Sequence, residues 1–350
     1  MRTVHVNTAK EYDVLIGSGL LAAIGEHVSA MKKVRTVCIV SDENVFPLYG
    51  KTVADSLEKH GIRVESFVFP AGESYKNAET YLKLLNYLAE EGLTRTDLIV
   101  ALGGGVVGDL AGFAAATYLR GISYIQVPTT LLAAMDSSVG GKTAIDLPAG
   151  KNLAGAFHQP DLVLCDITCL DTLPERVFRD GCGEVIKYGI LYDEALFSHL
   201  MERGLDFDRE AVITRCVELK RDAVVQDEFD TGARMKLNLG HTVGHAIEKC
   251  SHYAVTHGEA VAAGTAIVSR MAYHAGICDQ TTMEQIIAII HKFRLPVTTG
   301  YSAEELSGFA ISDKKRSGAH INMILPERIG FCRIVSVPIQ NIPSFIEAGL

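Results

Sequence analysis

Apolar residues in the first half of the chain form short runs that alternate with longer amphipathic segments. Short apolar runs predict strands, and apolar residues recurring every three or four positions predict helices. The predicted strands are residues 34–41, 62–69, 97–102, 122–127 and 162–165, and the predicted helices are residues 45–60 and 78–91. Strands that alternate with helices imply a parallel sheet covered by helices. We therefore predict an α/β domain with a Rossmann-like parallel sheet over residues 1–172.

From about residue 173 the apolar spacing becomes that of helices. Residues 208–226, 236–249, 259–274 and 283–293 follow the helical period, and residues 321–325 and 331–337 flank a turn as a predicted hairpin. A chain of 350 residues is also long for a single core. We therefore predict a second, mostly α-helical domain over residues 173–350.

A glycine-rich turn follows the predicted strand at residues 97–102. Gly103, Gly105 and Gly108 satisfy the G-x-G-x-x-G pattern and precede a helix, where a backbone can approach a pyrophosphate. Tight packing is the alternative explanation. The pattern lies outside the first strand–helix unit, and the next strand ends on Pro-Thr-Thr rather than an acid. Asp42, after the strand at residues 34–41, is a candidate ribose ligand, with an ordinary turn residue as the alternative.

Overall composition limits the possible partners. The chain has 33 basic and 42 acidic residues, for a net charge of −9, which argues against nucleic acid or an anionic membrane. It has no apolar signal segment and no apolar run of membrane-spanning length. Eight cysteines without a C-x-x-C pair fit free thiols in a reducing compartment. We expect a cytoplasmic protein.

Histidines gather in one stretch of the second half. His241 and His245 are four residues apart, so they share a helix face, and His257 could return to that face from a second helix. Glu184 lies in an apolar, glycine-rich run and is the best candidate carboxylate. Two histidines and one acid with open positions form a usual set for a catalytic Zn2+ or similar ion. Surface or core histidines are the alternative, and Gly240 and Gly244 also fit close helix packing.

Lysines in the first half suggest an anion site. The run ending in Gly-Gly-Lys142-Thr resembles the tail of a phosphate-binding loop, but the required first glycine is replaced by Asp136, so an ATPase is excluded. Lys142, and Lys151 with Asn152, are better explained as groups aimed at an anionic ligand. Solvated surface lysines are the alternative.

Several of these runs occur together in one known family. They are residues 71–76 (AGESYK), 103–109 (GGGVVGD), 128–130 (PTT), 136–142 (DSSVGGK), 151–152 (KN), 183–188 (GEVIKY), 238–248 (NLGHTVGHAIE), 257–259 (HGE) and 313–315 (DKK). With these ordered matches over nearly the whole chain, the protein resembles the 3-dehydroquinate synthases, which share a superfamily fold with glycerol and iron-dependent alcohol dehydrogenases. The resemblance implies a dehydroquinate synthase-like fold.

The resemblance also implies a metal and a nucleotide site. It places the ligands of one Zn2+ or Co2+ ion on Glu184, His241 and His257, whereas His245 faces the substrate. NAD would contact a set that extends from the glycine turn to the 169–172 turn: Glu73, Lys76, Gly104, Gly105, Asp109, Thr129, Thr130, Asp136, Lys142, Lys151 and Thr172, with Asp42 as the ribose candidate.

The substrate implied by the resemblance is 3-deoxy-D-arabino-heptulosonate 7-phosphate, a sugar acid with carboxylate and phosphate groups. Its contacts would be Lys142, Asn152, Lys187, Lys220, Arg234, Asn238, His245 and Lys314, together with Arg120 reaching across a homodimer interface. Of these, Asn152, Lys187, Asn238 and Lys314 would meet the phosphate, and Arg234, with Lys142 or Lys220, would meet the carboxylate.

The implied reaction is a lyase cycle without net redox change. NAD oxidises C5 transiently, phosphate leaves by β-elimination, hydride returns, the ring opens, and an intramolecular aldol reaction closes the carbocycle. The elimination base is either His245 or the departing phosphate. The alternatives are a sister cyclase, such as 2-deoxy-scyllo-inosose synthase or a valiolone-forming enzyme, a polyol dehydrogenase of the superfamily, or a non-catalytic sensor. Arg234 favours a substrate with a carboxylate.

Overall fold

The computed structural model describes residues 1–31, 34–314 and 319–350, without the side chains of residues 312–314. The chain forms two compact units. The first contains Met1–Leu173 and Arg209–Phe229, and the second contains Pro174–Asp208 and Asp230–Leu350. The break at Leu173 lies beside the predicted boundary. The predicted second domain differs from the second unit because the helix after Asp208 packs with the first unit.

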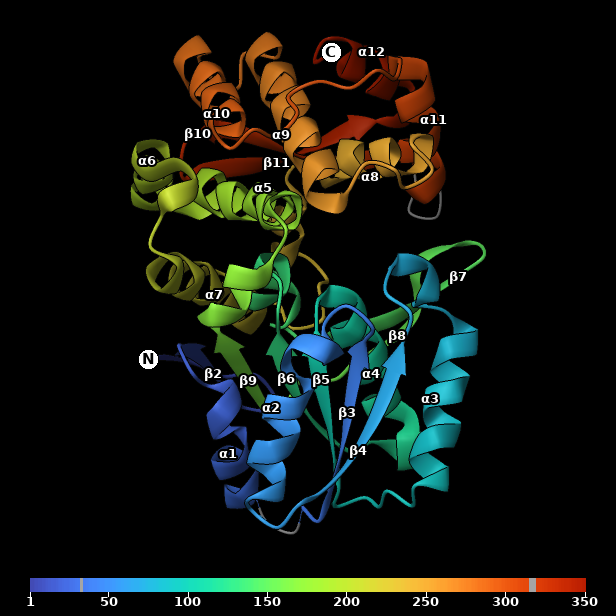
Figure 1. The fold of residues 1–350 in the computed structure, drawn as a ribbon. Coiled ribbons are helices and arrows are strands. Elements are labelled where there is room, and N and C mark those ends of the chain that lie inside the picture. The colour runs from blue at the N-terminus through green and yellow to red at the C-terminus, as the bar shows by residue number, and fades with distance from the viewer. Residues whose placement is uncertain (32–33, 315–318) are drawn as a thin grey trace. The chain divides into compact units, whose positions relative to one another are not determined.

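The first unit is built on a seven-stranded sheet in the order β1-β2-β9-β6-β5-β3-β4 (Figure 1). Its strands are β1 (Arg2–Val6), β2 (Tyr12–Gly17), β3 (Thr36–Asp42), β4 (Arg63–Phe69), β5 (Leu98–Gly103), β6 (Ser123–Pro128) and β9 (Leu162–Asp166). All neighbours pair in parallel except β1 and β2. The five predicted strands are therefore confirmed. The sequence patterns did not predict β1 and β2.

Alternating side chains of the strands fill two cores, one on each face of the sheet. Val37 and Ile39 of β3 belong to one core, and Cys38 and Val40 to the other. The first core includes residues of α1 (Ile24–Ala30) and α2 (Phe46–Glu58), and the second includes residues of α3 (Ala78–Glu90) and α4 (Gly105–Thr117). These helices cover the sheet in Figure 1. Burial on both faces explains the continuous apolar strand sequences.

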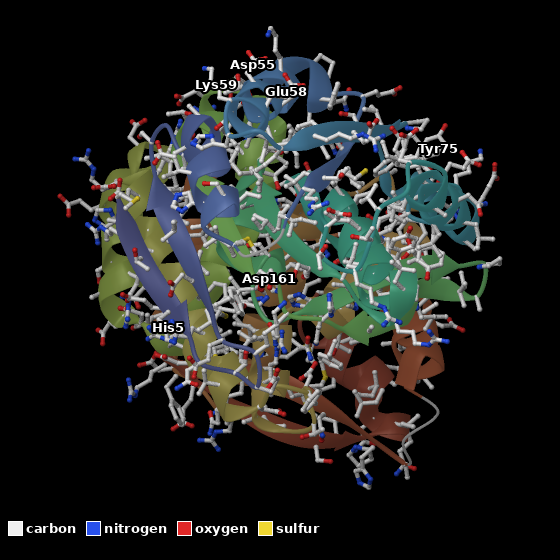
Figure 2. All side chains as sticks on the ribbon, turned by 90° about the horizontal axis from the view of Figure 1, so that it is seen from below. His5, Asp55, Glu58, Lys59, Tyr75 and Asp161 are labelled. Atoms are coloured by element: carbon white, nitrogen blue, oxygen red, sulfur yellow. The ribbon has the colours of Figure 1, made fainter. Side chains whose placement is uncertain are left out.

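Polar side chains mark the outside of this unit. In Figure 2, Glu58 and Lys59 lie at the end of α2, and both are exposed, whereas Val53 and Leu57 of the same helix are buried. His5 on the edge strand β1 lies 2.8 Å from Asp13 Oδ1. Elements with one polar and one apolar face give the sequence periodicity from which the helices and strands were predicted.

Two further elements complete the first unit. The strands β7 (Lys142–Leu147) and β8 (Gly150–Phe157) form an antiparallel hairpin. Helix α7 (Arg209–Gln226) contacts β1 and β2 and is the helix that returns to this unit. Short helical turns occur at η1 (Leu21–Ala23), η2 (Glu73–Tyr75), η3 (Tyr118–Arg120), η4 (Ala133–Ser137) and η5 (Ile167–Thr172).

The second unit is mostly helical. Its helices are α5 (Glu175–Tyr192), α6 (Glu194–Arg203), α8 (His241–Cys250), α9 (His257–His274), α10 (Gln280–Lys292), α11 (Ala303–Lys314) and α12 (Ile342–Glu347), with short turns η6 (Gly204–Asp206), η7 (Ala233–Asn238) and η8 (Ile339–Asn341). The strands β10 (His320–Arg328) and β11 (Phe331–Pro338) form the predicted antiparallel hairpin. None of the described helices meets the length and apolarity needed to cross a membrane.

The predicted helix at residues 236–249 was wrong at its start. Residues Ala233–Asn238 form a separate short turn, and α8 begins only at His241. The break occurs at Gly240, which has φ +77° and lies so close to α9 that an added Cβ would be 2.7 Å from the carbonyl oxygen of Val261. A glycine with positive φ interrupts the right-handed helix at this position. It also makes His241 the first residue of a helix.

Candidate metal and nucleotide sites

Three side chains from three helices of the second unit come together as a candidate metal centre. Nε2 of His241 lies 3.2 Å from Oε1 of Glu184, and Nε2 of His257 lies 3.3 Å from the same oxygen. One ligand atom from each residue lies within 4.8 Å of the other two. Two imidazoles and one carboxylate at this spacing can hold a Zn2+ or Co2+ ion and leave open positions.

Close helix packing produces this spacing. An added Cβ at Gly244 on α8 would lie 3.0 Å from the carbonyl oxygen of Ala260 on α9, and one at Gly264 would lie 2.2 Å from that of Gly240. The predicted packing role of Gly240 and Gly244 is confirmed. Helix α5 approaches α9 equally closely, because an added Cβ at Gly258 would lie 1.8 Å from the carbonyl oxygen of Asp180. Glycine is therefore required where the ligand-bearing helices meet.

The first turn of α9 is additionally held in place by side chains. Thr256 and Glu259 form a capping box, and Oδ1 of Asp180 accepts a hydrogen bond of 3.1 Å from the backbone N–H of Glu259. Glu259 also pairs with Arg176 of α5 at 2.9 Å. These contacts fix the backbone from which His257 projects.

Glu184 is a buried carboxylate suited to a cation. It is 0% exposed, and neither of its oxygens has a hydrogen-bond partner in the described part of the chain. Its contacts are ion pairs with Lys187, one helical turn away on α5, and with the two histidines. Burial opposes its negative charge, but Lys187 and His241 hold the pKa of Glu184 well below its ordinary value. A carboxylate in this state has the negative charge that a metal ligand needs.

The two histidines are oriented through their other ring nitrogens. Nδ1 of His241 lies 3.0 Å from the carbonyl oxygen of Leu239, which can only accept, so Nδ1 is a donor and Nε2 is the nitrogen turned toward Glu184. Nδ1 of His257 faces Oε2 of Glu248 at 3.6 Å. Burial lowers the pKa of His257, but the carboxylates of Glu184 and Glu248 raise it to about 10. Metal binding therefore has to displace a proton from this imidazole.

Two of the remaining predicted site residues of the second unit, His245 and Lys187, contact this cluster or its neighbours. His245 is about half-exposed, and its Nε2 lies 4.0 Å from Oε2 of Glu248. Arg234 is buried and Asn238 is exposed, at opposite ends of the turn before α8. Lys187 is buried and pairs with Glu184. Lys314 ends α11, and its side chain lies outside the described part of the chain.

The first unit carries the glycine turn at the carboxyl edge of its sheet. β5 ends at Gly103, and α4 begins at Gly105 with Gly104 as a cap that offers no side chain to the first backbone N–H groups. β3 has β4 on one side and β5 on the other, so the strand order reverses beside this turn. Ligands bind at such reversal points, and a helix N-terminus favours phosphate.

Neighbouring strand ends supply polar groups to the same edge. The N–H of Thr129 donates to the carbonyl oxygen of Gly103 at 3.0 Å, and its buried hydroxyl has no hydrogen-bond partner among the described residues. Thr130 lies next to Gly104, because an added Cβ there would be 3.1 Å from the Thr130 Cγ2 atom. These threonines therefore lie with the glycine turn, as a shared nucleotide site requires.

Lys76 is the centre of a buried charge cluster in the first unit. Its Nζ atom lies 2.9 Å from Glu73, 3.1 Å from Asp109, 3.7 Å from Asp146 and 2.7 Å from Oδ1 of Asn152. Burial opposes the charge on Lys76, but these carboxylates raise its pKa. Burial raises the pKa of Asp109 to about 6, although Lys76 opposes the rise. The cluster joins four of the predicted cofactor and substrate residues.

Two predicted cofactor residues have structural partners. Oδ1 of Asp42 accepts hydrogen bonds from the N–H groups of Asn44 at 2.9 Å and Val45 at 3.0 Å, as expected of a turn residue. The hydroxyl of Thr172 contacts that of Tyr49. These contacts account for both side chains locally, and a role in NAD binding stays a prediction.

The other predicted anion-binding residues of the first unit occupy three places. Lys220 on α7 is buried and pairs with Asp136 in the η4 turn. Lys142 is exposed at the start of β7, and Lys151 lies 3.7 Å from Glu73. Arg120 is exposed and has φ +70°, next to Leu119 with φ +50°. Two consecutive left-handed residues form a strained turn that projects Arg120 from the surface.

Sequence reasoning missed three acidic residues near the candidate sites: Asp146, Asp180 and Glu248. Asp146 accepts from the N–H of Asn152 at 2.8 Å, so it supports the hairpin turn. Glu248 could have been found, because it lies seven residues after His241, or two helical turns along the same face. Asp180 left no such signal, since its contact is with a distant helix.

Known proteins match nearly the whole chain. Family models described as 3-dehydroquinate synthase N-terminal and C-terminal match residues 66–180 and 181–316. A relative from Enterococcus faecalis named 3-dehydroquinate synthase is 44% identical over 347 residues, covering 97% of each chain.

Two solved structures share the fold. A 2-deoxy-scyllo-inosose synthase in complex with carbaglucose-6-phosphate, NAD+ and Co2+ is 26% identical, with TM-score 0.89 and 100% of each chain covered. A 2-epi-5-epi-valiolone synthase from Streptomyces hygroscopicus with NAD+ and Zn2+ bound is 27% identical, with TM-score 0.88 and coverage of 99% of this chain and 98% of that one. The higher identity lies with the synthase rather than with these sister cyclases. This chain belongs to the 3-dehydroquinate synthase family.

Proposed function

We propose that the protein is a phosphate-eliminating lyase that converts 3-deoxy-D-arabino-heptulosonate 7-phosphate to 3-dehydroquinate and phosphate. The observation that carries the proposal is the Glu184, His241 and His257 cluster in a chain 44% identical to a 3-dehydroquinate synthase over 347 residues. A site of this kind needs a divalent ion, and the family reaction needs both an ion and a nicotinamide.

Glu184, His241 and His257 would hold the Zn2+ or Co2+ ion. The donor set fits, because a buried carboxylate without hydrogen-bond partners faces two Nε2 atoms at 3.2 and 3.3 Å. When bound, the ion acts as a Lewis acid toward substrate oxygens, and NAD+ accepts and returns a hydride. The protein's own contribution is to fix the three ligands, which the close contacts of α5, α8 and α9 provide.

The glycine turn and its neighbours would hold NAD+. Gly104 and Gly105 leave the first backbone N–H groups of α4 accessible to a pyrophosphate, and the Thr129 hydroxyl is available to accept or donate a hydrogen bond. The wider set is Glu73, Lys76, Asp109, Thr130, Asp136, Lys142, Lys151 and Thr172, with Asp42 as the ribose candidate. Lys76 and its carboxylate partners are preorganised, which lowers the cost of ordering them on binding.

Cationic and amide side chains would bind the doubly anionic substrate. We assign Asn152, Lys187, Asn238 and Lys314 to the phosphate and Arg234, with Lys142 or Lys220, to the carboxylate. His245 is about half-exposed beside the metal cluster, so it can exchange protons with a bound substrate. A net charge of −9 means that these cations act locally rather than through the overall field.

We further propose a homodimer in the cytoplasm, in which Arg120 reaches the phosphate of the partner's site. The strained, exposed turn at residues 119–120 supports this role, because such strain is usually retained for function. All eight cysteines are free thiols, which fits a reducing compartment.

Phosphate release provides the direct test. The protein is incubated with the heptulosonate phosphate or with glucose 6-phosphate, each with NAD+, and with or without a chelator. We expect phosphate release only from the heptulosonate phosphate, and its loss with the chelator. Release from glucose 6-phosphate would favour the sister cyclase, and steady accumulation of NADH would favour a polyol dehydrogenase.

A further inference from the structure

Glu248 is a buried carboxylate that the proposed reaction does not use. It lies on α8 and is 4% exposed. Its Oε2 atom lies 3.6 Å from Nδ1 of His257, an ion-pair distance slightly longer than a direct hydrogen bond. The opposite ring nitrogen of His257 faces Glu184 at 3.3 Å. The imidazole is therefore held between two carboxylates, one on each side.

The two candidate histidine ligands have different supports. His241 is oriented by a backbone group, the carbonyl oxygen of Leu239 at 3.0 Å. The first turn of α9 offers His257 no equivalent, since backbone carbonyls near a helix N-terminus point along the helix toward later residues. A side chain from another helix has to take that place, and Glu248 is the described carboxylate within ion-pair distance of Nδ1.

The position of Glu248 follows from the helix packing. Glu248 lies seven residues after His241, so both project from the same face of α8. The contacts at Gly240 and Gly244 bring that face against α9, where His257 is the first residue. Glu248 and His257 thus meet because of the same packing that assembles the ligand cluster.

From this geometry we propose that Glu248 is a positioning residue, which holds the Nδ1 proton of His257 so that Nε2 points its lone pair at the metal. Carboxylates that accept from the second nitrogen of a ligating histidine fix its tautomer and orientation and strengthen it as a ligand. The proposal deepens the proposed function and depends on its metal site.

Co2+ affinity of the full-length protein tests the proposal without using activity. The apo protein, Glu248→Gln and Glu248→Asp are titrated with Co2+ against a competing chelator, and the visible absorption of bound Co2+ and the number of ions bound are recorded. We expect Glu248→Gln to weaken Co2+ binding about 10-fold to 100-fold. Glu248→Asp should show an intermediate loss, because the shorter side chain keeps the charge but withdraws it from Nδ1.

Glu284→Gln is the matched control. It removes an exposed carboxylate from helix α10 of the same unit, where Oε1 accepts a hydrogen bond of 2.7 Å from Gln280 rather than from an imidazole. We expect it to change Co2+ affinity by less than about threefold, because a surface carboxylate contributes little.

Three results would overturn the proposal. One is unchanged Co2+ affinity in Glu248→Gln. Another is wild-type affinity in Glu248→Asp together with a loss in Glu248→Gln, which would mean that only the charge acts. The third is binding of two ions by the wild type and one by Glu248→Gln, which would make Glu248 a ligand with His245. If Glu184→Gln also left Co2+ binding intact, the metal site itself, and not merely the role of Glu248, would be wrong.

Discussion

The two candidate sites differ in the groups that balance their buried carboxylates. In the first unit, the ammonium of Lys76 lies among the carboxylates of Glu73, Asp109 and Asp146, and burial raises the pKa of Asp109 to about 6, so a protein cation and a raised pKa together limit the buried negative charge. In the second unit, Glu184 and Glu248 flank His257, and Lys187 pairs with Glu184. The two carboxylates raise the pKa of His257 to about 10, so the imidazole holds a proton that a bound metal ion would replace.

The charge cluster of the first unit is therefore complete once the protein folds, whereas the cluster of the second unit is completed when a metal ion binds. A buried charge is costly unless it is paired, so the second cluster should gain strongly from a bound ion. The nucleotide site relies on backbone N–H groups at a strand–helix turn, whose geometry is set by the sheet. Substitutions in the two units should therefore have separable effects on metal binding, NAD+ binding and stability.

The largest effect is expected from Glu184→Gln. It removes the anionic ligand while keeping the side-chain size, so turnover should fall at least about a thousandfold and Co2+ binding should be lost. NAD+ affinity should be preserved, as the nucleotide site lies in the other unit. Turnover and metal content are measured alongside Glu79→Gln, an exposed carboxylate on α3. Full activity of a metal-free Glu184→Gln preparation would contradict the metal assignment.

Gly258→Ala should separate the ligand-bearing helices. The new Cβ would lie 1.8 Å from the carbonyl oxygen of Asp180, so α5 and α9 must move apart at a cost of about 3 kcal/mol. Thermal or urea unfolding measures the loss, and Co2+ titration should show weaker binding. Gly308→Ala is the control, because an added Cβ there meets no atom within 4 Å. Equal stability of the two variants would show that the close contact is not required.

Asp109→Asn tests the charge balance of the first unit. The folded-state pKa of Asp109 is about 6, above its ordinary value of 3.8, so the folded protein binds this proton more tightly than the unfolded chain. Its contribution to stability is therefore present at low pH and is lost as pH rises toward about 6, by at most about 3 kcal/mol. Urea unfolding of wild type and variant from pH 4 to 8 gives the difference. A wild-type advantage that grows with pH would mean that Lys76 dominates instead.

Gly104→Ala should produce the smallest effect. The residue has φ −77°, which alanine tolerates, but the added Cβ would lie 3.1 Å from Thr130 at the point where a pyrophosphate would approach. We expect about tenfold weaker NAD+ binding, or roughly 1.4 kcal/mol, with unchanged Co2+ affinity. Calorimetric titration with each ligand measures both. Weaker Co2+ binding with normal NAD+ binding would reverse the assignment of the two units.

Local patterns along the chain determined much of this protein. The apolar runs predicted five strands of the sheet, and the inner ones, β3, β5, β6 and β9, are largely apolar because they are buried on both faces. The helical spacing predicted α2, α3, α7, α9 and α10 to within three residues at either end. The turn at Gly103, Gly105 and Gly108 and the histidine stretch identified both candidate sites, since glycine and imidazole at fixed spacing have specific physical uses.

Only the tertiary structure decided which side chains meet. Glu184 and His257 are 73 positions apart in sequence, and their contact depends on glycines that let α5, α8 and α9 approach closely. The return of α7 to the first unit and the pairing of His257 with Glu248 also arise from packing between distant segments. A sequence pattern records the period of one element, whereas the distance between two elements depends on the shapes of both surfaces.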